Sequence, residues 1–453
     1  MGLRYKCAKN AATRDDMVEE ASLPNHSVFM IVEHAQMSDS NGTPRRILLL
    51  SPFFFPELIS TGKANTHLAQ ALAAHGAEVS VVCSHPLYPD WIPVRSDAPL
   101  SGVTILRDGA WVRYPKRMSL RRAVLEGWFA GYAAYHAWRL RRRVDVVVGV
   151  FPPSLFALGT HFLLPRRVRR VAVVHDLQGV LAGQHESALR RGIARLIHAV
   201  ESRVFHAQDR CIFFSADMAQ VARESYGLDA EKVAVQYPFV TIERWSAAGA
   251  TEPESRLQHV LPSGQAHVVY SGALGFKQNS EILVRWMQTA AQRFSGVQFH
   301  VFSGGPIFDK LRARAASLAD MRVHFHPLVE ERDLPELYAR STIQLVPQAE
   351  KTEAGALPSK LPNLLAAGIY TLAITSASSE VARLLREAKT GSVVERWEEP
   401  LFLARLEEAL QQAQAVSAAE RQRQTQALLS RFTVENMVQL IVGAEQSAAG
   451  EKA

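Results

Sequence analysis

An alternation of apolar strands and amphipathic helices begins near residue 46 and continues almost to the end of the chain. Residues 47–50 form the first continuous apolar run, residues 64–75 carry apolar side chains at helical spacing, and Gly76 follows where a helix would end. A strand that is apolar on both sides belongs in a parallel sheet whose two faces are covered by helices. The pattern therefore predicts a doubly wound α/β fold.

The alternation breaks at residues 251–265, where the sequence TEPESRLQHVLPSGQ is polar and contains Pro and Gly. It restarts at residue 267, so we predict two consecutive Rossmann-like domains that face each other across a cleft. A single large α/β domain is the alternative, which typical domain sizes disfavour. The predicted boundaries are 1–44 for a mobile N-terminal extension, 45–245 for the first domain, 246–425 for the second, and 426–453 for a C-terminal helix and tail that could cross back to the first.

The charge and the cysteine content restrict the partners of the chain. The formal net charge of +7 suggests an anionic partner, and nucleic acid, anionic lipid or a phosphorylated substrate would all satisfy that. The three cysteines are too scattered for a disulfide framework or a zinc site, so we expect reduced thiols in a cytoplasmic protein and no metal site. Charged residues interrupt the apolar stretches near the N-terminus, and we expect neither a secretory signal nor a membrane span there.

The loop after the first strand, SPFFFPELISTGK, ends with a glycine just before a helix. At Gly62 the backbone N–H groups could approach an anionic or hydroxyl-rich ligand. This loop alone is a weak indication, because a plain strand-to-helix turn looks similar. It is not a Walker A loop, since Glu57 stands where the first glycine would be. Further motifs are the segment with Pro86, Tyr88, Pro89 and Trp91, and the later segments YSGALGFKQNSE, FSGGP and LPSKLPNLLAAG.

Taken together, these segments resemble the family 4 retaining glycosyltransferases, in particular their colanic-acid-type exopolysaccharide branch. The resemblance runs from about residue 46 to about residue 432. It implies the GT-B fold, with a nucleotide-diphosphate sugar held mainly by the second domain and the acceptor mainly by the first. It also implies transfer of a hexose-type sugar to a lipid-linked saccharide in bacterial exopolysaccharide or lipopolysaccharide biosynthesis. Same-face attack would retain the anomeric configuration, with no metal and no cofactor besides the nucleotide sugar as co-substrate.

The resemblance also implies a set of site residues. Departure of the nucleotide diphosphate leaves negative charge that a metal-free enzyme must offset with fixed cations. Lys277 matches the family's diphosphate-binding lysine, and Lys360 could supply the cation that is lost where the family's Gly-Arg pair is Gly272-Ala273 here. The expected catalytic residues are His175, Lys277 and Lys360, and the expected donor-binding residues are Gly62, Gly272, Gly304, Gly305, His326, Ser359 and Asn363.

The E-x7-E signature that is common in family 4 is absent from this chain. Its two positions hold Gly355 and Asn363, and the colanic-acid-type branch also has Asn at the second. Glu350 and Glu353 lie close by and could replace the lost carboxylates, or they belong to a flexible acidic loop. Each expected lysine could likewise be a solvated surface charge, and His175 could be a packing residue.

Residues 113–143 form a basic and aromatic stretch. Its apolar centre is shorter than the roughly 20 residues that a spanning helix needs, so we expect it to lie on an anionic membrane surface. An ordinary buried helix with arginine ends is the alternative. We expect acceptor and membrane contacts at the inner face of the plasma membrane from Arg121, Arg122, Trp128, Trp138, Arg141, Arg142 and Arg143.

Two other functions fit parts of the sequence. A nucleotide-sugar epimerase of the same architecture would bind the same donor and need no acceptor. A nucleotide-sugar-binding module without catalysis would fit the missing E-x7-E glutamates. A nucleic-acid binder fits the charge but none of the motif order, so we expect no nucleic-acid partner. The donor sugar and its base, GDP or UDP, are open at this stage.

Overall fold

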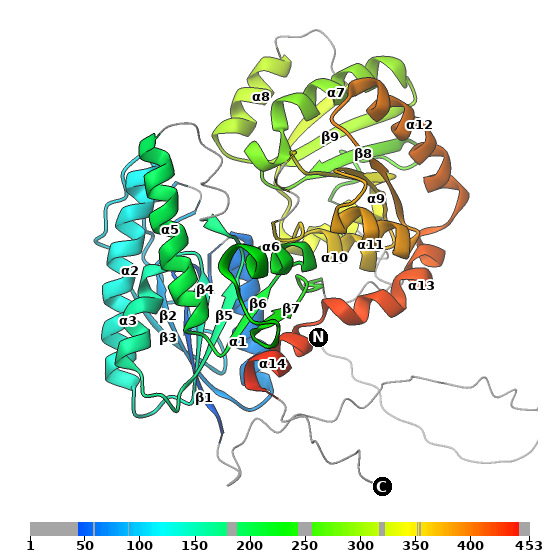
Figure 1. The fold of residues 1–453 in the computed structure, drawn as a ribbon. Coiled ribbons are helices and arrows are strands. Elements are labelled where there is room, and N and C mark those ends of the chain that lie inside the picture. Colours follow the sequence, from blue (N-terminus) through cyan, green and yellow to red (C-terminus); the bar gives the residue numbers. More distant parts are fainter. Residues whose placement is uncertain are drawn as a thin grey trace, which may run out of the picture. The chain divides into compact units, whose positions relative to one another are not determined.

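The computed structural model describes residues 44–57, 59–88, 90–178, 188–242, 256–316, 322–350, 352 and 355–443. It contains two separate parallel β-sheets that are covered by helices (Figure 1). This confirms the predicted fold class of two doubly wound Rossmann-like domains. Most of the predicted N-terminal extension, the predicted boundary near residue 245, and the residues Pro89 and Glu353 lie outside the described residues.

The first sheet has seven strands in the order β3-β2-β1-β4-β5-β6-β7. The first apolar run of the sequence is β1, which pairs with β2 on one side and β4 on the other. Both faces of this strand are covered, and its residues 47–50 are at most 1% exposed. The strands are β1 (Arg46–Leu50), β2 (Glu78–Ser84), β3 (Val103–Asp108), β4 (Val146–Phe151), β5 (Arg169–Val174), β6 (Arg210–Phe213) and β7 (Val233–Val235).

The helices of the first domain follow its strands along the chain. α2, α3 and α5 form one layer over the first sheet (Figure 1). α1 packs with the C-terminal helix α14, whose Met437, Val438 and Ile441 enter the core of this domain. The helices are α1 (Ser60–Ala74), α2 (Met118–Leu140), α3 (Leu155–Leu163), α5 (Ala188–His206), α6 (Ala216–Tyr226), the short η1 (Ala230–Lys232), and α14 (Val434–Val442).

The second sheet has six strands in the order β10-β9-β8-β11-β12-β13. Apolar runs in the sequence predict five of them, at residues 267–270, 298–302, 322–325, 343–346 and 371–374, and miss β13, a four-residue edge strand. The strands are β8 (Ala266–Ser271), β9 (Val297–Ser303), β10 (Val323–Pro327), β11 (Ile343–Pro347), β12 (Tyr370–Ile374) and β13 (Gly391–Val394). The helices are η3 (Phe276–Gln278), α7 (Ser280–Arg293), α8 (Pro306–Ala316), η4 (Glu331–Asp333), α9 (Leu334–Arg340), α10 (Leu361–Ala366), α11 (Glu380–Ala388), α12 (Glu399–Ala415), α13 (Ala418–Leu429) and η5 (Ser430–Phe432).

Parallel pairing places the loops that follow the strands at one edge of each sheet. In doubly wound folds ligands bind at this edge, because the strand bodies are buried under helices. Most of the residues expected at the catalytic and donor sites follow β1 and β5 in the first sheet and β8, β9 and β11 in the second, whereas His326 lies within β10. No helix of the described ranges is both long and apolar enough to cross a bilayer.

Candidate active site

A hollow of about 540 Å³ lies between the carboxyl ends of strands of the two sheets. The first sheet contributes the start of α1, one face of α2, and His175 and Asp176 after β5. The second contributes η3 and the segment before α10. Its lining includes Phe53, Trp91, Arg121, Arg122, Glu126, His175, Asp176, Lys277 and Ser359.

His175 directly follows β5 and lines the hollow. Its ring lies against Phe214, with the ring centroids 4.4 Å apart. Burial lowers the pKa of His175 to about 3, so the imidazole is neutral at physiological pH. Its Nε2 atom has no hydrogen-bond partner among the described residues. The structure therefore places a neutral imidazole, with one ring nitrogen available, at the predicted strand end.

Lys277 lies in η3 and enters an ion pair with Asp176, with Nζ 2.8 Å from Oδ2. The lysine side chain is 52% exposed and the aspartate 26%. Lys277 thus faces the hollow as the sequence predicts, next to His175. Asp176 is a partner that was not predicted, although its carboxylate directly follows a strand end, which is a signal in the sequence that could have revealed it.

Lys360 precedes α10 and is not a solvated surface charge. Its Nζ donates to the carbonyl of Leu345 at 2.5 Å and to that of Ser271 at 3.3 Å, and it lies 4.4 Å from the ring centroid of Tyr270. Burial lowers the pKa of Lys360 to about 7. The amine therefore lies under the carboxyl ends of β8 and β11, while its neighbour Ser359 lines the hollow.

Asn363 has a different place from the donor contact that the resemblance implies. Its side chain is 5% exposed. Its Oδ1 accepts from the N–H of Thr241 at 2.9 Å, and its Nδ2 donates to the hydroxyl of Thr241 at 3.0 Å. Asn363 therefore ties the segment between the two sheets to α10, and a donor contact by this side chain would break those bonds. Glu350 is exposed after β11.

The glycines expected at the donor site divide into two kinds. Gly272 and Gly305 have φ angles of +141° and +91°, which side chains rarely adopt, so these turns after β8 and β9 require glycine. Gly304 stands beside Gly305 with open space at its Cα. Gly62 lies in the first turn of α1, where a Cβ atom would come within 2.9 Å of the Cβ of Glu57. Its small size therefore leaves room for a side chain of the protein itself.

His326 belongs to a row of three imidazoles on adjacent strands. His267 Nε2 lies 2.9 Å from the carbonyl of Pro262, which can only accept, so that nitrogen carries the proton. His267 Nδ1 then accepts from His300 Nε2 at 3.1 Å, and His300 Nδ1 accepts from His326 Nε2 at 3.2 Å. Burial lowers the pKa of His300 to about 2 and that of His326 to about 4, and repulsion between the histidines adds to this. His300 and His326 are therefore neutral at physiological pH.

The residues expected at the acceptor and membrane lie at different ends of α2. Arg121 and Arg122 are near its start and line the hollow. Trp128 stacks on Tyr132 and covers Gly109, so it packs within the domain. Trp138, which is 51% exposed, lies at the far end beside Arg141, Arg142 and Arg143. A helix of this length extends roughly 35 Å, so the two basic groups are separate surfaces.

Glu126 also lines the hollow, and no role was predicted for it from the sequence. It lies on the same face of α2 as Arg122, and its carboxylate accepts from the N–H groups of Ser154 and Leu155 at 3.0 Å each. Burial raises the pKa of Glu126, and these backbone bonds partly oppose the rise. The contact joins residues far apart in the chain, so neither spacing nor composition reveals it.

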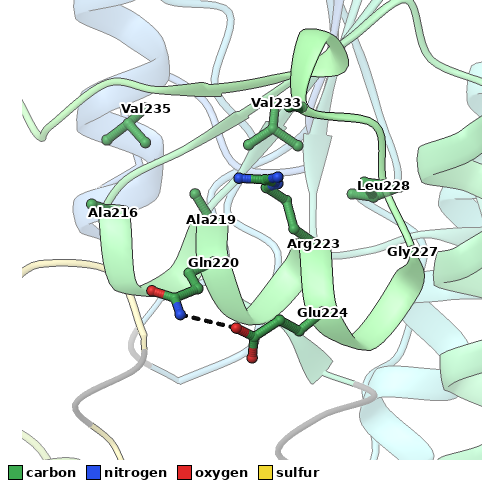
Figure 2. Close-up of a pocket in the computed structure, with 10 residues that line it drawn as sticks. Ala216, Ala219, Gln220, Arg223, Glu224, Gly227, Leu228, Val233 and Val235 are labelled. Carbon is green, nitrogen blue, oxygen red and sulfur yellow. Dashed lines mark hydrogen bonds between the residues drawn. The ribbon is translucent and has the colours of Figure 1, made fainter.

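A second hollow of about 580 Å³ lies on the first domain between α6 and β7. Figure 2 shows Gln220 and Glu224 bonded to each other along α6, with Arg223 facing Val233. None of the residues expected to act on a substrate lines it. We therefore take the hollow between the sheets as the candidate active site. The described residues contain no group of three or more His, Cys, Asp or Glu side chains that could hold a metal ion.

Known proteins match this chain along most of its length. Residues 62–244 match the family described as Glycosyltransferase Family 4, and residues 265–412 match the family described as Glycosyl transferases group 1. WcaI of Escherichia coli strain K12, named as a colanic acid biosynthesis glycosyl transferase, is 28% identical over 354 residues, which are 75% of this chain and 85% of that protein.

Two solved structures share the fold at low sequence identity. WaaG, a glycosyltransferase involved in lipopolysaccharide biosynthesis, has a TM-score of 0.66 and 16% identity, over 88% of this chain and all of that chain. HepE from Anabaena, solved in complex with UDP-glucose, has a TM-score of 0.58 and 16% identity, over 87% of this chain and 98% of that chain.

The two doubly wound sheets and these structural neighbours show the GT-B fold, and the two matched families identify the chain as a glycosyltransferase. The chain belongs to glycosyltransferase family 4, and the predicted resemblance to the colanic-acid-type branch is confirmed.

The histidine row makes the stability of the protein depend on pH. An unfolded histidine has a pKa of about 6.5, whereas the native pKa values of His300 and His326 are about 2 and about 4. Well above pH 6.5 both histidines are neutral in the native and in the unfolded protein. As the pH falls from 6.5 towards 4, the unfolded chain binds protons that the native row does not, so the free energy of unfolding decreases.

Replacing one member of the row should therefore reduce this dependence. Between pH 7.5 and pH 5.0 we expect His326→Gln to lose roughly 1–2 kcal/mol less free energy of unfolding than the wild type, because one titrating group is gone and the amide can still donate to His300. Urea unfolding at the two pH values measures the difference. If the free energy of unfolding of the variant falls by as much as that of the wild type, or by more, His326 is not held neutral in the native protein.

Proposed function

We propose that this chain is a retaining glycosyltransferase that moves a hexose-type sugar from a nucleotide-diphosphate sugar to a lipid-linked saccharide. The pathway would be the biosynthesis of a bacterial exopolysaccharide or lipopolysaccharide. The observation that carries the proposal is the cleft in which Lys277, Asp176 and the neutral His175 meet. The name of the colanic acid relative and the UDP-glucose in the HepE complex support the substrate classes.

The donor diphosphate would bind along the strand ends of the second sheet. Lys277 is half exposed, and an ion pair of this kind is worth at most about 1 kcal/mol, so a diphosphate with a larger charge can replace Asp176. Lys360 lies under β8 and β11 with a pKa of about 7, and a nearby diphosphate would favour its charged form. Both cations would then offset the charge that develops on the leaving group.

Retention is best explained by attack on the same face of the sugar. A double displacement needs a carboxylate that is available as nucleophile. In the described part of the cleft the donor would release Asp176 from Lys277, but Glu126 stays bonded to two backbone N–H groups, so the two carboxylates do not form a free pair of nucleophile and acid. The acceptor hydroxyl would bond to the anomeric carbon as its bond to the diphosphate oxygen breaks, and the hydroxyl proton would pass to the departing diphosphate. His175 would act as a neutral hydrogen-bonding partner of the sugar.

The epimerase and the non-catalytic binding module remain the alternatives. Both would need the donor half of the cleft and neither would need an acceptor wall. Arg121 and Arg122 line the wall opposite the donor half and form no salt bridge within the described ranges. Arg122 has only the electrostatic attraction of Glu126, whose carboxylate is bonded to two backbone N–H groups. The positive charge that this leaves on the wall favours a second, anionic substrate, and hence a transferase.

Removal of either lysine should impair the donor half. We expect Lys277→Ala and Lys360→Met each to lower turnover by at least about a hundredfold, as is typical when one charge-stabilising group is lost. Affinity for the nucleoside diphosphate should fall by roughly 1.5–3 kcal/mol, measured by calorimetry. Lys310→Ala, an exposed lysine on α8, is the matched control and should change neither quantity. Near-normal turnover of Lys360→Met would show that Lys360 only supports the strand ends.

The stereochemistry and the metal requirement test the reaction itself. The product linkage should keep the anomeric configuration of the donor, which NMR of the product determines. Activity should survive EDTA, because the proposed charge stabilisation comes from lysines. An inverted linkage, or full loss in EDTA with recovery on adding magnesium or manganese, would contradict the proposal. Conversion of the donor sugar without any acceptor product would favour the epimerase.

The far end of the α2 and α3 layer is suited to an anionic membrane surface. Tyr135, Trp138 and Phe162 are exposed there by 55%, 51% and 83%. Arg167 donates to the carbonyls of Arg141 and Arg142, which brings the arginines after α2 and those after α3 together. Exposed aromatic rings among arginines are typical of proteins that bind at the lipid headgroup level. We propose that this surface holds the enzyme at the membrane that contains its acceptor.

Binding to vesicles tests this surface. The protein should sediment with anionic vesicles at low salt and be released as ionic strength rises, because salt screens the attraction. Neutralising Arg139, Arg141, Arg142 and Arg143 together should reduce binding without unfolding the protein. Neutralising four exposed arginines of the second domain, Arg285, Arg312, Arg396 and Arg423, is the matched control and should not. Equal binding to neutral and anionic vesicles would contradict the proposal.

A further inference from the structure

Trp91 has a backbone conformation that a tryptophan rarely adopts. Its φ angle is +59°, in the left-handed region, and its N–H donates to the carbonyl of Leu87 at 2.6 Å. A bulky residue persists in this conformation only where the surrounding structure holds it, and such residues concentrate at functional sites. Trp91 lines the hollow between the sheets.

Glu57 and Gly62 hold the turn that contains Trp91. The carboxylate of Glu57 accepts from the N–H of Leu87 at 2.7 Å and from that of Tyr88 at 3.3 Å, and the side chain is 4% exposed. A Cβ atom on Gly62 would come within 2.9 Å of the Cβ of Glu57 and displace this carboxylate. The glycine loop after β1 therefore determines where the tryptophan lies.

The indole of Trp91 is oriented by two aromatic rings and one cation. Phe53 and Tyr114 contact it edge-on, with ring centroids 6.1 Å and 5.8 Å away. The guanidinium of Arg121 lies 4.2 Å from the centroid of the indole. An aromatic plane and a fixed guanidinium thus reach the same hollow, and this combination suits a ligand with both an apolar and an anionic part.

The charge of this wall is positive. Arg121 and Arg122 form no salt bridge in the portion of the chain that the structure describes, whereas Glu126 and Asp176 in the same hollow are bonded to other groups. Met118, one turn of α2 before these arginines, lines the same hollow and is 72% exposed, and Leu120, next to Arg121 in the chain, is 52% exposed. An apolar margin next to unpaired arginines fits a phosphate group that is attached to a lipid.

We propose that Trp91 and Arg121, with Arg122 beside them, bind the phosphate end of the lipid-linked acceptor, and that Glu57 and Gly62 are positioning residues for Trp91. This inference rests on the proposed function and assigns its acceptor half to specific residues. It also gives the glycine loop after β1 a role on the acceptor side, in place of the donor contact that we expected for Gly62.

Farnesyl diphosphate is a suitable probe, because it carries a diphosphate on an apolar chain and no sugar. Its affinity is measured by calorimetry with saturating UDP or GDP, whichever binds, so that the donor half is filled. The wild type should bind farnesyl diphosphate. Arg121→Gln and Trp91→Ala should weaken this binding by roughly tenfold, the factor that corresponds to the loss of one charge-assisted hydrogen bond, and leave nucleotide affinity unchanged. Lys277→Ala should weaken nucleotide binding and leave the affinity for farnesyl diphosphate unchanged.

The positioning residues have their own variants. Gly62→Ala and Glu57→Ala should weaken farnesyl diphosphate binding and raise the KM for the acceptor without changing nucleotide affinity, while Glu57→Gln, which can still accept from Leu87, should recover part of the affinity. Gly131→Ala is the matched control, since a Cβ on this exposed helical glycine has open space around it. Thermal unfolding shows which variants are folded, and Trp91→Phe replaces Trp91→Ala if the latter is not.

The outcomes separate the inference from the function on which it rests. If the wild type binds neither nucleotide, the proposed function is wrong. If it binds a nucleotide but not farnesyl diphosphate, or if folded variants at positions 57, 62, 91 and 121 bind the probe as the wild type does, the acceptor assignment is wrong. If glucuronic acid displaces the probe at equal concentration, Arg121 recognises a sugar carboxylate and the phosphate assignment is wrong.

Discussion

The burial of two parallel sheets is the constraint on which the rest of this structure depends. Strands such as β1 and β4 are covered on both faces, so the chain has no room for polar groups along them. Polar and charged side chains can then face a ligand only where the strands end. All strands of a sheet run the same way, so the residues that follow them lie at its carboxyl edge. These include His175 after β5, Gly272 after β8 and the segment between β11 and Lys360. The active cleft follows from this geometry.

The electrostatics of the cleft follow from burial as well. Burial keeps His175 neutral and brings the pKa of Lys360 into the physiological range, whereas the half-exposed Lys277 is paired with Asp176. On the proposed donor side Lys277 is thus paired with a carboxylate, and Lys360 is bonded to backbone carbonyls. A bound diphosphate would compete with both kinds of partner. On the proposed acceptor side Arg121 and Arg122 form no salt bridge within the described chain. The two anionic substrates that we propose would account for this difference between the two walls.

The sequence predicts what depends on local pattern. Continuous apolar runs identify every strand of the first sheet and five of the second, because a doubly covered strand must be apolar throughout. β13 escapes this rule, since it is an edge strand of four residues that begins with Gly391 and Ser392. The placement of His175 and Lys277 at strand ends also follows from local position, and the structure brings these two together in one cleft.

The contacts that the sequence does not predict join residues that are far apart in the chain. Asn363 bonds to Thr241, 122 positions away, and Glu126 bonds to Ser154, 28 positions away. The histidine row crosses three strands, and the left-handed turn at Trp91 depends on the carboxylate of Glu57. The two basic ends of α2 appear as one charged stretch in the sequence, but the length of the helix separates them into a cleft wall and an outer surface. Pattern reveals which residues are available, and tertiary packing decides what each one contacts.

A crystal structure with a bound nucleoside diphosphate tests the central claim most directly. The account predicts that the diphosphate lies at the carboxyl ends of β8 and β11, within hydrogen-bonding distance of Lys277 Nζ, and that Asp176 no longer pairs with that lysine. A nucleotide bound elsewhere, for example in the hollow between α6 and β7, with the pair of Lys277 and Asp176 intact, would contradict it.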